Sequence, residues 1–240
     1  VAISLENIYM SFSTAISGVF LPRITSMITQ KENEKSMSDL FIRTGRIQYI
    51  IMSFILIGFI LFGKQFIIIW AGSDYSEAYY ITLLFFVPLT IPLIQNLGIT
   101  ILQARNQMKF RSVSYVIIAI ISLGLSVFLV RYYGGIGCAL STAFALCIGQ
   151  ILIMNIYYFK KVNIDIPAFW REIGKMSVVP ILIGIVGYVL LNYFRIESIL
   201  TLFLGIVLFS IIYLPAFWHL SMNSYERNLF LKPLKKVLKK

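Results

Sequence analysis

Hydrophobic residues along this chain fall into seven long segments separated by polar connections. A transmembrane helix needs about 20 predominantly apolar residues, and each segment is close to that length. Backbone groups inside a bilayer must be hydrogen-bonded within the chain, so such segments should be helical. The pattern therefore predicts an all-α polytopic membrane protein, a bundle of about seven transmembrane helices at residues 1–22, 47–63, 79–102, 113–130, 136–159, 176–193 and 199–217.

Three of the connections have a pattern of their own. Residues 29–45 form a charged stretch long enough for a short surface helix. In residues 163–174, Asp165 precedes Pro167 as a candidate N-cap, and an aromatic pair follows, which is typical of an interfacial helix. The tail, 225–240, mixes apolar residues with lysine, as a segment on a membrane surface would. A plain solvated loop is the alternative for all three.

Composition agrees with a membrane protein: 59% of the residues are hydrophobic and only 13% are charged. The net charge of +11 could indicate a nucleic-acid-binding protein, but the distribution of the basic residues argues against nucleic acid. Of the 21 Lys and Arg residues, 18 lie in alternate connections, and only Lys64, Arg131 and Arg195 lie in the others. By the positive-inside rule, the basic-rich connections and the C-terminus are cytoplasmic. The excess positive charge then faces anionic membrane lipids.

The sequence contains no pattern that predicts a cofactor, a metal site or an enzyme. Cys138 and Cys147 lie on one predicted helix, roughly 13 Å apart, which is too far for a disulfide. His219 is the only histidine, so there is no Cys/His metal pattern and no histidine–carboxylate pair at membrane depth. The chain starts at Val1 without the features of a signal peptide, and we expect it to begin within a longer protein.

Polar residues form a stripe on the first segment. At 100° per residue, Glu6, Tyr9, Ser13 and Ser17 share one side of the helix. Ionisable groups at membrane depth usually face a bundle interior or a water-filled cavity, so we interpret this stripe as a cavity wall. Alternatively, Glu6 is solvated among the outer headgroups, because it is only about 9 Å from Val1 along the helix axis.

The third segment carries two prolines followed by two amides. Pro88 and Pro92 each remove a backbone hydrogen bond, so the helix should bend near mid-membrane, just before Gln95 and Asn96. Bent helices of this kind often lie at binding sites or hinges in transporters. A static kink packed against a neighbouring helix is the alternative.

Small residues repeat every four positions on the fifth segment, which predicts close packing against another helix: Gly137, Ser141, Ala145 and Gly149. The last two segments have few polar residues, and we expect them to be peripheral and lipid-facing.

Several stretches of this sequence resemble the polysaccharide or O-antigen flippase family of the multidrug/oligosaccharidyl-lipid/polysaccharide exporter superfamily. The resemblance covers nearly the whole chain and is weakest after residue 176. It rests on FLPRIT (20–25), FIIIWAGSDYSEAYY (66–80), IPLIQNLGITILQARNQMKFRSVSYVIIAI (91–120), YYGGIGCALSTAFALCIGQ (132–150) and NIYYFKKVNIDI (155–166).

The resemblance implies the C-terminal half of such a transporter. Residues 1–160 would be a lobe of five transmembrane helices, 161–175 an interfacial cytoplasmic connection, 176–220 two peripheral helices and 221–240 a basic cytoplasmic tail. The family moves lipid-linked oligosaccharide repeat units across the plasma (inner) membrane by alternating access, for surface polysaccharide biosynthesis. The implied partners are undecaprenyl-diphosphate-linked oligosaccharide and a missing N-terminal lobe.

The resemblance also assigns expected roles to residues. It favours the cavity-wall interpretation of the stripe that contains Glu6. It makes four basic residues candidates for binding the diphosphate or lipid headgroups, although ordinary membrane topology also accounts for each: Arg23, Arg105, Lys109 and Arg111. Within the superfamily the alternative is a cation-coupled multidrug exporter. A membrane glycan polymerase or ligase would need larger outer loops, and a truncated product without activity of its own is a further alternative.

Overall fold

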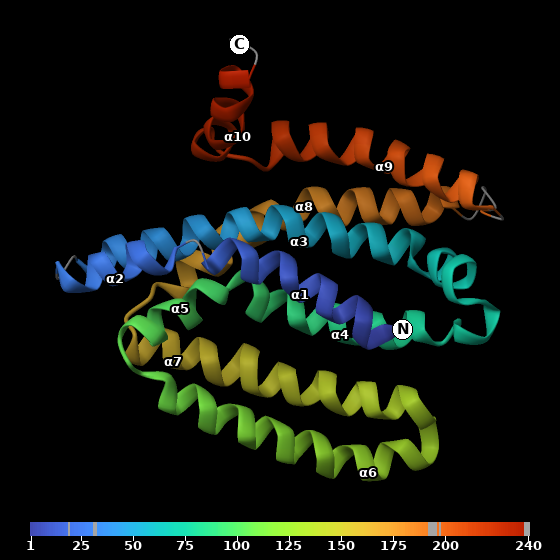
Figure 1. Ribbon diagram of the computed structural model, residues 1–240, viewed down its shortest axis with the longest axis horizontal. Helices are drawn as coiled ribbons and strands as arrows, with labels where there is room; N and C mark the ends of the chain where they lie inside the picture. The colour runs from blue at the N-terminus through green and yellow to red at the C-terminus, as the bar shows by residue number, and fades with distance from the viewer. Residues whose placement is uncertain (19, 31–32, 192–195, 197, 238–240) are drawn as a thin grey trace.

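The computed structural model describes residues 1–240 except 19, 31–32, 192–195, 197 and 238–240 (Figure 1). Within that part of the chain there are helices and no strands, which confirms the all-α prediction. The elements are α1 Ala2–Gly18, α2 Leu21–Thr29, α3 Glu34–Ala71, the 3-10 helix η1 Ser73–Tyr75, α4 Ala78–Ile94, α5 Asn96–Ala104, α6 Met108–Leu146, the π-helix η2 Cys147–Ile153, α7 Met154–Lys161, α8 Ile166–Leu191, α9 Ile199–Leu220 and α10 Ser224–Val237.

Five helical stretches among the described residues are long and apolar enough to cross a membrane: Glu34–Ala71, Ser73–Ile94, Met108–Lys161, Ile166–Leu191 and Ile199–Leu220. They confirm a polytopic membrane protein, although the sequence pattern predicts about seven crossings. One predicted segment is α1, whose 17 residues are shorter than the usual span. Two others, 113–130 and 136–159, lie together in the 54-residue stretch Met108–Lys161.

The chain reverses direction inside that stretch, at Gly134. This residue has φ 54° and ψ −133°, a conformation that glycine adopts without the steric cost of a Cβ atom. The two arms on either side, 108–133 and 135–153, then run back along each other (Figure 1). Ser122 and Thr142 are hydrogen-bonded across them at 3.1 Å. The stretch therefore accounts for two of the predicted segments.

The small residues of the second arm pack against the first arm, as the sequence pattern predicts. A Cβ atom on Gly137 would overlap the backbone of Leu129, and one on Gly149 would overlap the side chain of Ile118. Ser141 is hydrogen-bonded to Ser126 between the two contacts.

The helices stack in layers around α3 (Figure 1). On one side, α8 and α9 enclose a hydrophobic cluster with α3 that contains Leu61, Met176 and Phe209. Two hydroxyl contacts secure α8 and α9: Tyr49 donates to Ser177 at 2.6 Å, and Ser53 pairs with Tyr213 at 2.8 Å. The larger cluster lies on the other side of α3, among α1, α4, α5, α7 and the start of α8: its fully buried members include Tyr9, Phe41, Leu97 and Phe169.

The two ends of the bundle differ in chemistry. The basic-rich connections, at α2, between α5 and α6, between α7 and α8, and at α10, lie at one end, which we call the basic end (Figure 1). The α3–α4 connection and the bend of α6 lie at the opposite end. Exposed aromatic residues gather there, as at a membrane–water interface: Trp70, Tyr75, Tyr80, Tyr132 and Tyr133.

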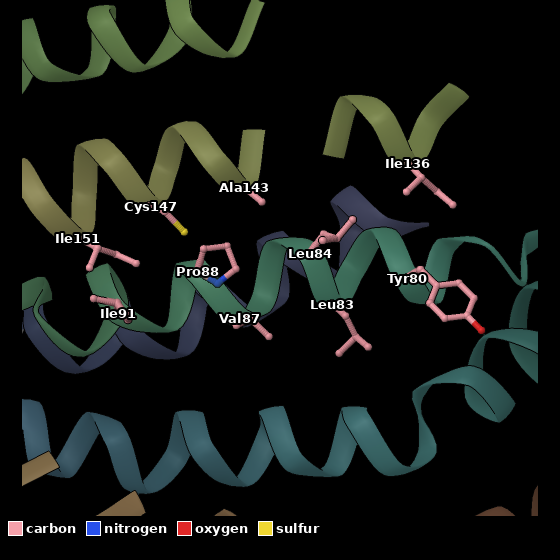
Figure 2. A pocket seen from close by; sticks show the side chains of 10 residues that line it. All are labelled: Tyr80, Leu83, Leu84, Val87, Pro88, Ile91, Ile136, Ala143, Cys147 and Ile151. Atoms are coloured by element: carbon pink, nitrogen blue, oxygen red, sulfur yellow. The ribbon is translucent and has the colours of Figure 1, made fainter. Parts of the chain in front are cut away.

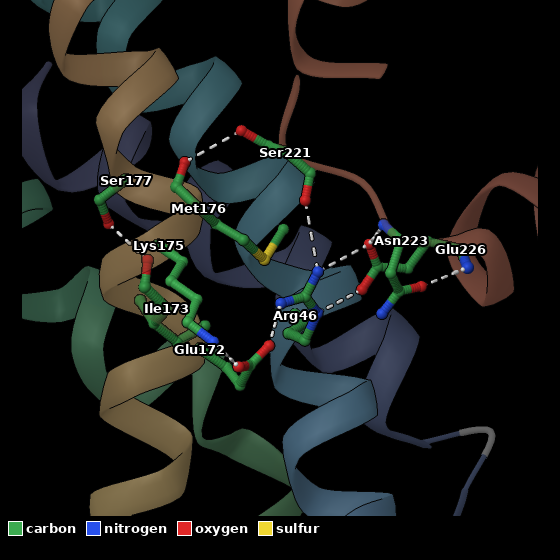
Figure 3. Close-up of polar contacts among 9 residues, drawn as sticks. All are labelled: Arg46, Glu172, Ile173, Lys175, Met176, Ser177, Ser221, Asn223 and Glu226. Atoms are coloured by element: carbon green, nitrogen blue, oxygen red, sulfur yellow. Dashed lines mark hydrogen bonds and ion pairs between the residues drawn. The ribbon is translucent and has the colours of Figure 1, made fainter. Parts of the chain in front are cut away.

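A buried ion-pair network joins three helices at the basic end (Figure 3). Arg46 of α3 is 5% exposed and pairs with Glu172 of α8 at 2.7 Å and, through two nitrogen atoms, with Glu226 of α10. The Glu226 carboxylate also accepts the backbone N–H of Asn223, whose side chain in turn accepts the backbone N–H of Glu226. One carboxylate thus caps α10 and neutralises Arg46.

At the start of α8, Asp165 accepts the backbone N–H of Ala168 at 2.9 Å, which confirms Asp165 as an N-cap. The helix then continues without a break to Leu191, so the expected interfacial segment and the sixth predicted span form one helix.

Candidate functional site

The polar stripe predicted on α1 faces the inside of the bundle. Tyr9 and Ser13 are completely buried, and Ser17 is nearly so. The Tyr9 hydroxyl is hydrogen-bonded with Thr90 at 2.7 Å and donates to the Met52 carbonyl at 3.3 Å, and its ring stacks on Phe86. These residues fasten α1 to α3 and α4, so the structure places them in helix–helix contacts.

Ser13 lies at the centre of a polar cluster contributed by α1, α3, α4 and α5. Its hydroxyl donates to the Leu93 carbonyl at 2.6 Å and accepts from the side-chain amides of Gln48 and Asn96, both at 3.3 Å. Ser13 and Asn96, which come from separate sequence patterns, are therefore brought together. We call Ser13, Gln48, Asn96 and the Leu93 carbonyl the Ser13 cluster.

A helix break places Asn96 in this cluster. Pro88 and Pro92 lie within α4, which ends at Ile94, and α5 begins at Asn96 after Gln95, whose backbone is not helical (φ −103°, ψ 12°). The sequence predicts a bend here, and the structure contains a change from one helix to the next. Its role as a hinge stays a prediction.

Sequence reasoning missed two buried polar residues of α3, one of which, Gln48, belongs to the Ser13 cluster. Thr44 and Gln48 are at most 1% exposed, and within the described part of the chain neither Thr44 Oγ1 nor Gln48 Oε1 has a hydrogen-bond partner. Gly45 lies between them and close to the Ile94 carbonyl, so α3 can approach the break. Unpaired buried oxygens cost free energy, and they make this contact less favourable than a fully paired one. The sequence could have indicated this polar contact through Gln48, an amide within an apolar segment.

Gln95 belongs to a different contact. Its side-chain amide donates to Asn155 of α7 at 2.8 Å, and the same oxygen of Asn155 accepts from the indole N–H of Trp170 at 3.1 Å. Gln95 thereby joins the break between α4 and α5 to α7, and through Asn155 to α8.

The opposite face of α1 is also polar, and it is exposed. Ser4, Asn7, Ser11 and Thr14 recur at alternating spacings of three and four residues, so they share one side of the helix, and all are exposed. This side is opposite to Tyr9 and Ser13. Sequence reasoning missed it because both faces of α1 carry polar residues, and only burial distinguishes them.

After α1 the chain continues as α2 toward the basic end (Figure 1), and α2 also carries exposed polar residues. Arg23, Ser26 and Thr29 are exposed there, whereas Ile24 and Met27 are buried against the bundle. We call the exposed residues Ser4, Asn7, Ser11, Thr14, Arg23, Ser26 and Thr29 the α1–α2 polar track.

The outward faces of α8 and α9 are different in kind. Their exposed side chains are overwhelmingly apolar, as expected for contact with lipid: Ile181, Leu182, Ile185, Val189, Leu200, Phe203, Leu204, Leu208, Ile211 and Leu214. A polar surface is costly against hydrocarbon. The polar track is therefore suited to a water-filled space or a polar partner.

Glu6 lies beside these two faces of α1. It is half-buried and makes no ion pair with any residue that the structure describes. Its place in a cavity wall stays a prediction.

The four basic candidates are not equivalent. Arg23 is exposed on the polar track. Arg105 donates to the Val162 carbonyl at 3.2 Å, and Arg111 lies over the Tyr115 ring and donates to its hydroxyl at 3.0 Å. Lys109 is exposed near the start of α6. All four lie at the basic end, and only Arg23 lies on the track.

Groups that could hold a metal ion are not found among the described residues, and Cys138 and Cys147 are both free.

The fold, with its long apolar helices, is that of an all-α polytopic membrane protein. No protein-family model and no solved structure matches the chain. It is similar to the protein named probable low-salt glycan biosynthesis flippase Agl15 from Haloferax volcanii, with 23% identity over 210 residues. The match covers 86% of this chain and 43% of that relative, so the chain spans less than half the length of the relative.

Proposed function

We propose that this chain is the C-terminal half of a flippase of the multidrug/oligosaccharidyl-lipid/polysaccharide exporter superfamily. The complete protein moves lipid-linked oligosaccharide repeat units across the plasma membrane by alternating access, for surface polysaccharide biosynthesis. It is a transporter without catalytic activity, and its basic connections and C-terminus are cytoplasmic. The similarity to a protein named as a glycan flippase supports this proposal.

The α1–α2 polar track is the structural observation that carries the proposal. A lipid-linked glycan has a hydroxyl-rich head, which needs hydrogen-bonding partners, and a hydrocarbon tail, which remains in lipid. Seventeen residues of α1 extend about 25 Å, most of the roughly 30 Å thickness of the hydrocarbon core. Serine, threonine and asparagine side chains on this path replace part of the water around the sugar as it crosses.

The basic end of the track suits the phosphate groups of the carrier. Arg23 presents a guanidinium group there, which can bind a phosphate through two parallel hydrogen bonds. Lys109, exposed at the same end, adds positive charge, whereas Arg105 and Arg111 already have partners within the fold. In this proposal, Arg23 is the first cationic contact of undecaprenyl diphosphate on the cytoplasmic side.

Alternating access needs an element with two arrangements. The break between α4 and α5 is suitable, because its cluster connects α1 to α3 and contains a buried oxygen, Gln48 Oε1, without a partner among the described residues. A movement of α1 can exchange hydrogen bonds within the Ser13 cluster without exposing it to lipid.

The test uses the complete parent gene in a strain that lacks its own flippase. Asn7→Leu combined with Ser11→Leu replaces two polar side chains in the α1 part of the track. We expect surface polysaccharide to fall by about tenfold or more, the loss expected for about 1.4 kcal/mol of transition-state stabilisation. Ser210→Val on α9 is the control, since Ser210 bonds only to its own helix at Ile206.

Normal surface polysaccharide at normal amounts of the double variant would contradict the proposal. Protection of cells against cationic dyes, with unchanged surface glycan, would instead support a cation-coupled multidrug exporter.

A further inference from the structure

An apolar groove lies between α4 and the second arm, residues 135–153, which comprises the end of α6 and η2 (Figure 2). Its volume is about 740 Å³, within the range of small-molecule sites in proteins. Pro88 and Ile91 of α4 face Cys147 and Ile151, while Tyr80 and Ile136 lie at the other end. The groove exists because the side chains of Ala143 and Cys147 are small where the two helices face each other.

The groove is on a different face of α4 from the polar surfaces of the bundle. Phe86 and Thr90 contact Tyr9 of α1, whereas the groove residues Leu84, Pro88 and Ile91 point toward the second arm of α6. Apart from the Tyr80 hydroxyl and the Cys147 thiol, the lining side chains are apolar. Such a surface does not suit a glycan, and apolar cavities do not hold water well.

The length of the groove along α4 distinguishes between possible occupants. From Tyr80 to Ile91 it follows eleven residues of α4, about 16 Å, which is half the thickness of a bilayer core. It starts among the exposed aromatic residues at the end opposite the basic end. A transmembrane helix would need a groove across the whole bilayer, whereas part of a hydrocarbon chain can be held within one leaflet.

A basic residue precedes the bend that leads to the groove. Arg131 is exposed and precedes the bend at Gly134, and Ile136 of the groove follows that bend. In the sequence, the connections on this side are poor in basic residues, and Arg131 is one of the few that they contain. A phosphate group at the bilayer surface is complementary to Arg131, while its hydrocarbon chain would lie along Pro88 and Cys147.

We infer that this groove binds the carrier lipid of the glycan, a long hydrocarbon chain ending in phosphate, in the leaflet that receives it. The inference rests on the proposed function, because that function supplies a lipid-linked cargo. The sugar would cross beside the α1–α2 polar track, and the tail would be held on the other side of α4 once the headgroup has arrived.

The test measures binding rather than transport. The complete protein is placed in phosphatidylglycerol–phosphatidylethanolamine vesicles with polyprenyl phosphate that carries a photoreactive group on its chain. We expect cross-links to concentrate on α4 and on residues 136–151, and unlabelled polyprenyl phosphate to compete better than added phosphatidylglycerol.

Two variants have matched controls. Ala143→Phe fills the groove and should lower cross-linking at least about fivefold, which corresponds to about 1 kcal/mol of binding free energy. Ala119→Phe, on the exposed face of the first arm, should not. Arg131→Gln should lower it about threefold to tenfold through loss of a charge-assisted phosphate contact, and Lys64→Gln should leave it unchanged.

Even labelling of all lipid-facing helices, equal competition by phosphatidylglycerol, or cross-links from the groove to another protein segment would each overturn the inference. Restored surface polysaccharide with even labelling contradicts the groove site alone. Labelling of the groove in a protein that does not restore polysaccharide contradicts the proposed function alone.

Discussion

At the scale of single residues, burial decides what each polar side chain of α1 can do. The sequence identifies Tyr9, Ser13 and Ser17 as a stripe, and the structure uses all three inside the bundle. Asn7 and Ser11, on the other side, have the exposed positions that a cavity wall requires. A helical period locates both faces but does not say which one is covered, because that depends on how α3 and α4 pack.

Ser13 is the residue whose loss should be most costly on α1. Ser13→Ala removes three hydrogen bonds and leaves the amides of Gln48 and Asn96 with fewer partners, so we expect the free energy of unfolding to fall by about 1–3 kcal/mol. Thermal unfolding of the purified full-length protein measures it. Ser11→Ala is the control, because Ser11 bonds only to Ile8 of its own helix. Equal losses in both variants would contradict the inward role of Ser13.

At the scale of elements, the hydrophobic segments were predictable, while the way they join was not. Residues 113–130 and 136–159 appear as two segments in the sequence, and they are two arms of one helical stretch bent at Gly134. The bend depends on the backbone conformation of Gly134. The sequence shows a group of glycines there but does not indicate at which one the chain turns. The expected bend after Pro92 is a complete helix break, because Gln95 adopts a non-helical conformation beside Gly45.

The bend of α6 depends on glycine at one position. Gly134→Ala places a Cβ atom on a residue with φ 54°, and we expect a loss of about 1–2 kcal/mol of stability. Gly124→Ala has open space and an ordinary helical backbone, so it should be neutral or slightly stabilising. Thermal unfolding of the two variants side by side tests this, and an unstable Gly124→Ala with an unaffected Gly134→Ala would reverse the assignment.

The Arg46 network should control whether α10 remains attached. Arg46→Met leaves the buried Glu226 carboxylate without its cation, so we expect a loss of about 3–5 kcal/mol and faster proteolysis of the tail. Lys175→Met, at an ion pair whose lysine is 67% exposed, should cost about 1 kcal/mol or less. Combining Arg46→Met with Glu226→Gln should restore part of the loss. Equal instability of the single and double variants would contradict a stabilising role of the Arg46–Glu226 ion pair.

At the scale of the whole molecule, the alternation of basic residues was the most informative sequence pattern. It predicts that the connections rich in Lys and Arg share one side, and the fold brings them to one end. The alternation of basic residues does not predict which side chains contact each other across the bundle. Arg46 and Glu226 are 180 residues apart in the chain, and a charge pattern does not indicate which acid will neutralise a given arginine.

The two ends should be reached from opposite sides of the membrane in cells. In the full-length protein with Cys138 and Cys147 replaced by serine, Asp74→Cys at η1 should react with a membrane-impermeant thiol reagent added outside. Lys109→Cys, at the basic end, should react only after the cells are opened, because the positive-inside rule predicts that the basic connections are cytoplasmic. Reaction of both cysteines from the same side would contradict the arrangement of the bundle.

Glu226 has two roles, as the partner of Arg46 and as a cap of α10, and this has a practical consequence. A shortened protein that stops after Met222 would lose the carboxylate that both starts α10 and neutralises Arg46. Trimming the basic tail to aid crystallisation, or replacing it with an affinity tag, would therefore disturb α3 and α8 in the body of the bundle. A cut placed beyond Val237 would retain this carboxylate.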